Sequence, residues 1–384
     1  MKRCLFLTAC NLCLIVALLM PARTQAAGSA WVNDRSTWYY VDEHGQKLIG
    51  WQEIDGAWYY LDPSDGKMLT GWQEIDGRWF YLGGNGKMRT GWQEVSGKWY
   101  YFGSNGRMRT GWQEVSGKWY YLGTNGVMRM NWQEVSGKWY YLGTNGVMRT
   151  NWQEISGKWY YLGTNGVMRT NWQQVSGKWY YLGTNGVMRT GWQELGSAWY
   201  YFNASGVMAD DGIYTISGKK YAFASGGRWR GEQSPVFFAA AEFMEEHQIV
   251  TDDMSRDEKM RACFDWLANK KNFSECNPWI PHYKGVDWPE RYAGYFFEHT
   301  TGNCFSVNAA FAYMAKVIGY EEVYCCHDTG HGWAEVDDLV YDPEWARTHS
   351  GNWFARSYDI PDPSGLQNYK ALRNKEIAWR YVKI

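Results

Sequence analysis

The first half of the chain repeats one pattern of aromatic and polar positions every 20 residues, from residue 31 to about residue 201, with one step of 21. In the unit that begins at Gly111, a five-residue run with Trp at its second position leads into Ser116-Gly117, and a second run of Trp and Tyr follows. Two short aromatic or β-branched runs around such a turn predict a β-hairpin, because Ser-Gly and Asp-Gly accept the positive φ of a type I′ turn. The pattern therefore predicts a series of hairpins.

The position of the turn also predicts the register of each hairpin. With the turn at 116–117, the expected cross-strand pairs are Val115 with Lys118, Glu114 with Trp119, and Trp112 with Tyr121. Three large rings then share one face, and a single hairpin cannot bury them. Stacked copies can cover one another, which predicts an all-β hairpin-repeat solenoid. Residues 212–231 keep the Ser-Gly turn but lack the leading Trp, as expected of a terminal capping unit.

After residue 231 the pattern changes to helical spacing. Ser234-Pro235 predicts the start of one helix, and Ser255 with Glu258 predicts the capping box of a second helix that runs to about Asn269. The polar and aromatic stretch 272–301 is expected to be rich in loops. The apolar run 305–318, which ends at Gly319, predicts a buried helix.

Three short runs typical of strands follow, at 321–326, 331–336 and 339–342. A turn at Asp337-Asp338 places His331 and Asp342 on one face, one diagonal step apart, where a carboxylate can hold an imidazole. Cys304 precedes the apolar helix, and the dipole at a helix N-terminus favours thiolate over thiol. A cysteine on a helix, a histidine on a strand and an aspartate on the next strand have the order and geometry of a Cys-His-Asp triad.

These residues allow two other interpretations. Cys304 could be an ordinary buried cysteine of an apolar helix. His327 and His331 with Cys325 and Cys326 have ligand-like spacing for zinc. A metal there would consume the thiolates and leave the Asp-Pro-Glu-Trp run at 342–345 without an explanation. We therefore predict no metal and no cofactor.

The repeats resemble the choline-binding (cell-wall-binding) repeats of surface proteins from Gram-positive bacteria and their phages. The resemblance rests on Gly-Trp, six residues, Trp-Tyr-Tyr, and then Gly-x-Met-x-Thr-Gly-Trp. It implies cages of aromatic rings and a Met between successive hairpins, where ring faces attract a quaternary ammonium. The ligand-binding residues that it implies include Trp72, Trp79, Tyr81, Trp92, Trp99, Tyr101, Trp112, Trp119, Tyr121, Met128 and Trp132. Related aromatic repeats bind glucans, so wall choline (teichoic acid) and glucan both stay open as partners. Asn131, Asn151 and Asn171 replace the usual Gly, which could alter the central sites.

The second half resembles the transglutaminase-like (papain-related) superfamily. The Gly-x-Cys helix, His-x-Trp-x-Glu-Val and Asp-Pro-x-Trp match its core motifs. The resemblance implies an α+β cysteine enzyme with Cys304 as nucleophile, His331 as base and acid, and Asp342 as the group that orients His331. The thiolate would attack an amide carbonyl of a protein or peptide substrate, and water would give hydrolysis whereas a lysine amine would give cross-linking. We expect a peptidase; the alternatives are a non-catalytic adhesin and an amidase of peptidoglycan stem peptides. Trp288, Tyr292 and Tyr295 are weak candidates for an oxyanion donor.

Composition and charge narrow the partners and the location. The 384 residues carry 39 Lys+Arg against 40 Asp+Glu, a formal charge of −1, which argues against nucleic acid and against a polybasic membrane-surface protein. A short basic start, an apolar run and small residues predict a signal peptide over 1–27, and no membrane span in the mature chain. We expect a secreted, wall-associated protein with repeats over 28–231 and an enzyme domain over 232–384. Five mature cysteines are an odd number, so any disulfides would leave a free thiol.

Overall fold

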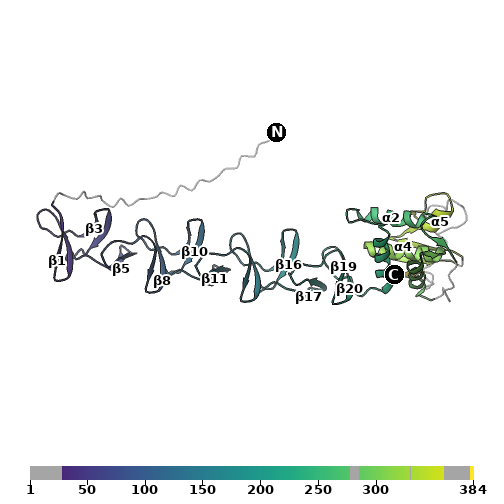
Figure 1. Ribbon diagram of the computed structural model, residues 1–384, viewed down its shortest axis with the longest axis horizontal. Helices are drawn as coiled ribbons and strands as arrows, with labels where there is room; N and C mark the ends of the chain where they lie inside the picture. The colour runs from purple at the N-terminus through teal and green to yellow at the C-terminus, as the bar shows by residue number, and fades with distance from the viewer. Residues whose placement is uncertain (1–27, 277–284, 329, 359–380) are drawn as a thin grey trace, which may run out of the picture. The chain divides into compact units, whose positions relative to one another are not determined.

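The computed structural model describes residues 28–276, 285–328, 330–358 and 381–384 (Figure 1). The predicted signal peptide lies outside these residues. The chain divides into two compact units, and the division falls within the repeats. Among the described residues, the first unit holds 28–173 together with 181–188, and the second holds 174–180 and those from residue 189 onward. No helix among the described residues has the length and apolar character needed to cross a membrane.

The repeats form antiparallel hairpins, and each hairpin is a separate two-stranded sheet. Every strand in them has five residues. The strands are β1 (Ala30–Asp34), β2 (Thr37–Val41), β3 (Gly50–Ile54), β4 (Ala57–Leu61), β5 (Gly71–Ile75), β6 (Arg78–Leu82), β7 (Gly91–Val95), β8 (Lys98–Phe102), β9 (Gly111–Val115), β10 (Lys118–Leu122), β11 (Asn131–Val135), β12 (Lys138–Leu142), β13 (Asn151–Ile155), β14 (Lys158–Leu162), β15 (Asn171–Val175), β16 (Lys178–Leu182), β17 (Gly191–Leu195), β18 (Ala198–Phe202), β19 (Gly212–Ile216) and β20 (Lys219–Phe223).

The predicted hairpin geometry is confirmed. Strands β9 and β10 pair in the expected register, with Trp112 opposite Tyr121. Ser116 and Gly117 have φ values of 52° and 70°, the two positive values that a type I′ turn requires. Asn131 has φ 62° where Gly111 has 71°, so Asn replaces Gly at a left-handed position that both residues accept.

Each repeat is joined to the one before it. The segment after β10 returns to the preceding hairpin, where the N–H of Met128 donates to the carbonyl of Trp99 over 2.8 Å. Gly126 lies so close to the preceding repeat that a Cβ on it would be 2.2 Å from Sδ of Met108. The same bonds recur from repeat to repeat, so successive hairpins stack as a solenoid.

The C-terminal part is an α+β arrangement around helix α4 (Figure 1). Its four-stranded antiparallel sheet has the order β25-β24-β23-β26, and α4 packs against β23, β24 and all four other helices. The elements are α1 (Pro235–Glu246), α2 (Arg256–Ala268), β21 (Ser274–Glu275), α3 (Trp288–His299), β22 (Thr301–Gly302), α4 (Cys304–Ile318), β23 (Val323–His327), β24 (Gly332–Val336), β25 (Leu339–Tyr341), α5 (Pro343–Thr348) and β26 (Tyr381–Lys383).

Helix boundaries in this part follow the predicted caps. The Ser234 side chain accepts from the N–H of Phe237, and Ser255 and Glu258 form the capping box of α2. Gly319, at φ 112°, ends α4. The expectation of a loop-rich stretch over 272–301 is wrong in part, because α3 lies within it. This helix buries Trp288, Pro289, Tyr292, Ala293 and Phe296 on one side, a helical spacing that is hard to see in a segment rich in aromatic residues throughout.

Candidate functional site

The aromatic rings of the repeats gather in grooves between neighbouring hairpins. The ring of Trp112 lies 6.4 Å from that of Trp119 and 5.1 Å from that of Tyr121, measured between centroids. The ring of Tyr140, from the next hairpin, lies 4.8 Å from that of Trp112. Trp119 is 41% exposed, so this ring face is available to a ligand.

The grooves keep their form where Asn replaces Gly. Trp132 lies 5.2 Å from Tyr141 and 4.9 Å from Tyr160, nearly the distances around Trp112. A cavity of about 280 Å³ opens here between two hairpins, and it is lined by Asn131, Trp132, Tyr141, Ile155, Ser156, Lys158 and Tyr160. The Asn substitutions therefore leave the ring arrangement intact.

The predicted cage residues belong to several grooves of this kind. Trp72 groups with Trp79 and Tyr81, and Trp92 groups with Trp99 and Tyr101. Trp132 has its ring contacts with its own hairpin and the following one, so it belongs to the groove after that of Trp112. The backbone of Met128 forms an isolated β-bridge with Leu122, the last residue of β10, so Met128 belongs to the same unit as Trp112.

The predicted nucleophile stands at the start of the buried helix. Cys304 is the first residue of α4, and the Asn303 side chain caps that helix by accepting from the N–H of Ser306 over 3.2 Å. The thiol is half-buried, and its Sγ lies 4.0 Å from the carbonyl oxygen of Gly330. This position combines the field of the helix N-terminus with access from outside, two conditions for a reactive thiolate.

The predicted contact between His331 and Asp342 is present. His331 Nε2 lies 2.6 Å from Asp342 Oδ2, and the two residues are 5% and 0% exposed. The strands place them as expected, because the turn at Asp337-Asp338 sets the β24–β25 register. The carboxylate of Asp328 fixes the approach to His331 by accepting its backbone N–H over 2.7 Å.

Asp342 is surrounded by donors, and this determines the tautomer of His331. Its Oδ1 accepts from the N–H of Trp345 over 3.1 Å and lies 3.3 Å from Nδ2 of Asn308. A carboxylate that only accepts requires the proton of the His331–Asp342 bond to sit on Nε2. Nδ1 is then the ring nitrogen that remains for Cys304. The Asp-Pro-Glu-Trp run thereby gains a structural explanation, since Asp342 also caps α5.

Opposing effects act on the charge of His331. Burial disfavours the imidazolium, but the charge of Asp342 and hydrogen bonds to Asp342 and Cys304 outweigh it and raise the pKa of His331 to about 10. The imidazolium form is therefore favoured at neutral pH, where it can stabilise a neighbouring thiolate.

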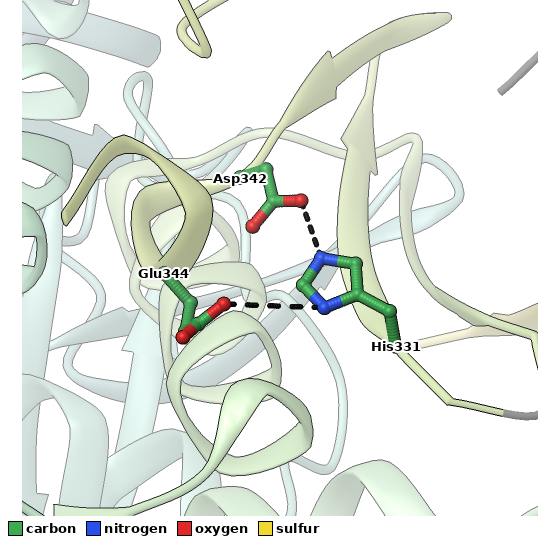
Figure 2. Close-up of side chains that lie close together, drawn as sticks. All are labelled: His331, Asp342 and Glu344. Carbon is green, nitrogen blue, oxygen red and sulfur yellow. Dashed lines mark hydrogen bonds and ion pairs between the residues drawn. The ribbon is translucent and has the colours of Figure 1, made fainter. Parts of the chain in front are cut away.

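A second carboxylate approaches the other edge of the ring. Glu344 Oε2 lies 3.9 Å from His331 Nδ1, and Figure 2 shows Asp342 and Glu344 at different ring nitrogens. Burial raises the pKa of Glu344. Ligand atoms of these three residues lie within 4.8 Å of one another, but one ion can bind only one nitrogen of a ring, and Asp342 holds the other. The geometry favours hydrogen bonding and ion pairing over metal ligation.

The other candidate residues have contacts of their own. Cys325 and Cys326 are adjacent on β23, so their side chains point to opposite sheet faces and do not converge as a zinc pair. Among the described cysteines, Cys263, Cys276, Cys304 and Cys325 are free thiols. The rings of Trp288 and Tyr292 pack on Phe305, whereas the Tyr295 hydroxyl lies 3.9 Å from the thiol of Cys276.

Comparison with known proteins assigns the repeats. The model of the choline-binding repeat matches in overlapping segments from residue 26 to residue 232, more than half of the chain. The chain belongs to the choline-binding repeat family. The matched segments are 26–70, 69–108, 89–131, 109–151, 130–171, 149–190, 169–202 and 189–232.

Several solved structures are similar to the part with choline-binding repeats. CbpJ from Streptococcus pneumoniae TIGR4 is 29% identical, covers 53% of this chain and 94% of its own, and has a TM-score of 0.38. The choline-binding domain of CbpL from Streptococcus pneumoniae is 33% identical over 49% of this chain and 100% of its own, with a TM-score of 0.37. The modular autolysin LytC of the same species is 28% identical, covers 54% of this chain and 53% of its own, and has a TM-score of 0.33. A search of curated proteins finds no match. The family assignment rests on the repeat model.

Two kinds of residue in these sites escape the sequence pattern. In the choline-binding repeats, Tyr140 and its equivalents reach the Trp of the preceding hairpin from the opposite strand face, a contact that only stacking reveals. In the C-terminal part, Asn308 and Glu344 join the Cys304–His331–Asp342 group. The sequence does contain a signal for Asn308: it is a polar residue within an apolar run, and its position four residues after Cys304 places both on one side of the helix.

Proposed function

We propose that this protein attaches to a choline-bearing cell wall through its repeats and acts there as a transglutaminase-like cysteine enzyme that cleaves peptide amide bonds. The observation that carries the enzymatic part is the 2.6 Å bond between His331 Nε2 and Asp342, with Nδ1 left for Cys304 at the start of α4. The family membership of the repeats supports the attachment.

The groove geometry suits a quaternary ammonium ligand. Rings of Trp112, Tyr121 and Tyr140 converge from two hairpins, and a cation over such ring faces gains about 0.5–2 kcal/mol per contact. One groove binds weakly, but a row of them on one chain raises the overall affinity for a wall that carries many choline groups. Glucan is the second candidate ligand, since sugar CH groups can pack on the same ring faces.

The C-terminal residues account for each proton and bond of an acyl transfer. The Cys304 thiolate attacks the amide carbonyl and forms a C–S bond, while the N–H of Cys304 is the expected donor to the oxyanion. The C–N bond then breaks as His331 Nδ1 gives its proton to the leaving amine. Water next loses a proton to Nδ1 and attacks the thioester, which releases the acid and restores the thiolate–imidazolium pair.

The test is the pH dependence of Cys304 alkylation by iodoacetamide in the mature chain, residues 28–384, which lacks the three cysteines of the predicted signal peptide. Cys276→Ser removes the other half-buried thiol among the described residues, and His331→Ala in that background is the comparison. An ordinary thiol titrates at about pH 8.5, whereas a thiol paired with a histidine reacts well below pH 7. We expect fast reaction at about pH 6 that disappears in His331→Ala. If both proteins react as ordinary thiols, the enzyme proposal is wrong and a surface adhesin remains.

If the alkylation test supports the enzyme proposal, a comparison of activity on purified cell wall and on proteins identifies the substrate. Attachment to the wall brings the site to peptidoglycan stem peptides as well as to proteins. Release of new amino groups from purified wall would indicate an amidase of stem peptides, and cleavage of protein substrates would indicate a peptidase. Cys304→Ala should abolish either activity and leave binding to choline unchanged.

A further inference from the structure

Asn308 contacts all three segments that carry the predicted catalytic residues. Its side chain is fully buried on α4. Its Nδ2 donates to the carbonyl of Cys304 over 2.9 Å and to the carbonyl of Gly332, next to His331, over 2.6 Å. The same nitrogen lies 3.3 Å from Oδ1 of Asp342.

The orientation of this amide is determined by its surroundings. Nδ2 faces three oxygen acceptors, and the reversed orientation would place Oδ1 against all three of them. In the orientation found, Oδ1 is buried and no described side chain or backbone group donates to it. A buried acceptor without a hydrogen bond lowers the stability of the folded protein. Packing alone would therefore favour an apolar residue of similar size at position 308.

We propose that Asn308 is a positioning residue that holds the Cys304 helix, the His331 strand and the Asp342 carboxylate in register. It acts in two ways. Its bonds to the carbonyls of Cys304 and Gly332 fix the distance between the thiol and the imidazole. Its nitrogen also lies 3.3 Å from Oδ1 of Asp342, where the positive end of the amide dipole stabilises the ionised carboxylate, and this keeps the proton on His331 Nε2 and directs Nδ1 to Cys304. This inference rests on the proposed function.

The experiment replaces Asn308 with Leu in the mature chain, residues 28–384, with Cys276→Ser, and measures Cys304 alkylation by iodoacetamide against pH. Leu has a similar size but no donor. We expect alkylation of Cys304 at about pH 6 to slow roughly tenfold. Asn308→Ser keeps one donor and should lie between wild type and Asn308→Leu.

Phe311→Leu is the matched control. Phe311 is buried on the same helix, and its ring packs on the rings of Phe264 and Tyr341. This substitution should lower the unfolding temperature without moving the alkylation profile. A merely structural role of Asn308 predicts the same behaviour for Asn308→Leu.

The outcomes separate this inference from the proposed function. If Asn308→Leu keeps the wild-type profile while His331→Ala loses it, Asn308 has no positioning role and the enzyme proposal stands. If wild type itself reacts as an ordinary thiol, both proposals fail. Should the Leu variant not fold, as judged by circular dichroism, the Ser variant decides, and a wild-type profile there contradicts the inference.

Discussion

The imidazole of His331 stands between two carboxylates with different surroundings. Asp342 is fully buried and accepts hydrogen bonds from its neighbours, whereas Glu344 lies 3.9 Å from the ring on the side left to Cys304. When Glu344 is ionised, it stabilises the imidazolium but also adds negative charge beside Cys304. We therefore expect this side chain to control which charged reagents can approach Cys304.

This effect is testable with methanethiosulfonate reagents of opposite charge. In Cys276→Ser protein, we expect Cys304 to react faster with the 2-aminoethyl than with the 2-sulfonatoethyl reagent, and Glu344→Gln should reduce that ratio roughly threefold to tenfold. Burial raises the pKa of Glu344, so the carboxyl stays neutral further up the pH scale than an ordinary glutamate. The preference should grow as pH rises through that raised pKa, and it should be independent of pH in Glu344→Gln. An unchanged ratio in the variant would locate the controlling charge elsewhere.

Single residues also show where sequence reasoning ends. The contact between His331 and Asp342 was predictable because a two-residue turn and strand alternation determine it locally. Asn308 and Glu344 enter the site through the packing of α4 and α5 against the sheet. No local periodicity encodes that packing.

At the scale of elements, the hairpins were the most predictable part. Their turn residues and aromatic alternation lie within about a dozen consecutive positions, and the register of β9 and β10 follows from them. Helix α3 was missed because its buried face shares its aromatic composition with the flanking segment. Its helical form depends on the core that it covers, which includes α4.

The contacts between repeats predict unequal effects for two glycines of one unit. Gly126 and Gly117 both have left-handed φ, at 76° and 70°, but only Gly126 has Met108 beside it. Alanine at either position costs about 1–2 kcal/mol of backbone strain. We expect Gly126→Ala to lose more stability than that, because Met108 must also move.

Urea unfolding followed by Trp fluorescence measures both variants. Gly117→Ala is the control for the backbone term, since nothing lies within 4 Å of its added Cβ. Equal losses of stability in the two variants would show that the close approach of Gly126 to Met108 contributes nothing.

At the scale of the whole molecule, the two parts are stabilised in different ways. The repeats depend on contacts between neighbouring hairpins, whereas the C-terminal part has one continuous core around α4. A change in the number of repeats should therefore alter attachment and leave the Cys304 site unaffected.

Deletion of residues 131–170 tests this independence. The deletion removes two whole units and joins Met130 to Asn171, which preserves the 20-residue period. With fewer grooves, we expect affinity for a choline-coated surface to fall roughly tenfold or more, with an unchanged pH profile of Cys304 alkylation. Surface plasmon resonance with free choline as competitor measures the binding. Deletion of 131–140 breaks the period and should unfold neighbouring repeats; equal binding by both deletions would contradict the repeat-by-repeat account.

The bond from Met128 to the carbonyl of Trp99 has a consequence for the gene. The equivalent bond recurs in the described repeats from Met68 to Met208, and it joins backbone atoms of positions that nearly every unit shares. Unequal crossing-over between the coding repeats would therefore add or remove whole units at junctions that already fit. We expect the length of the repeat array to change most easily in steps of one unit, which is 20 codons in all but one case.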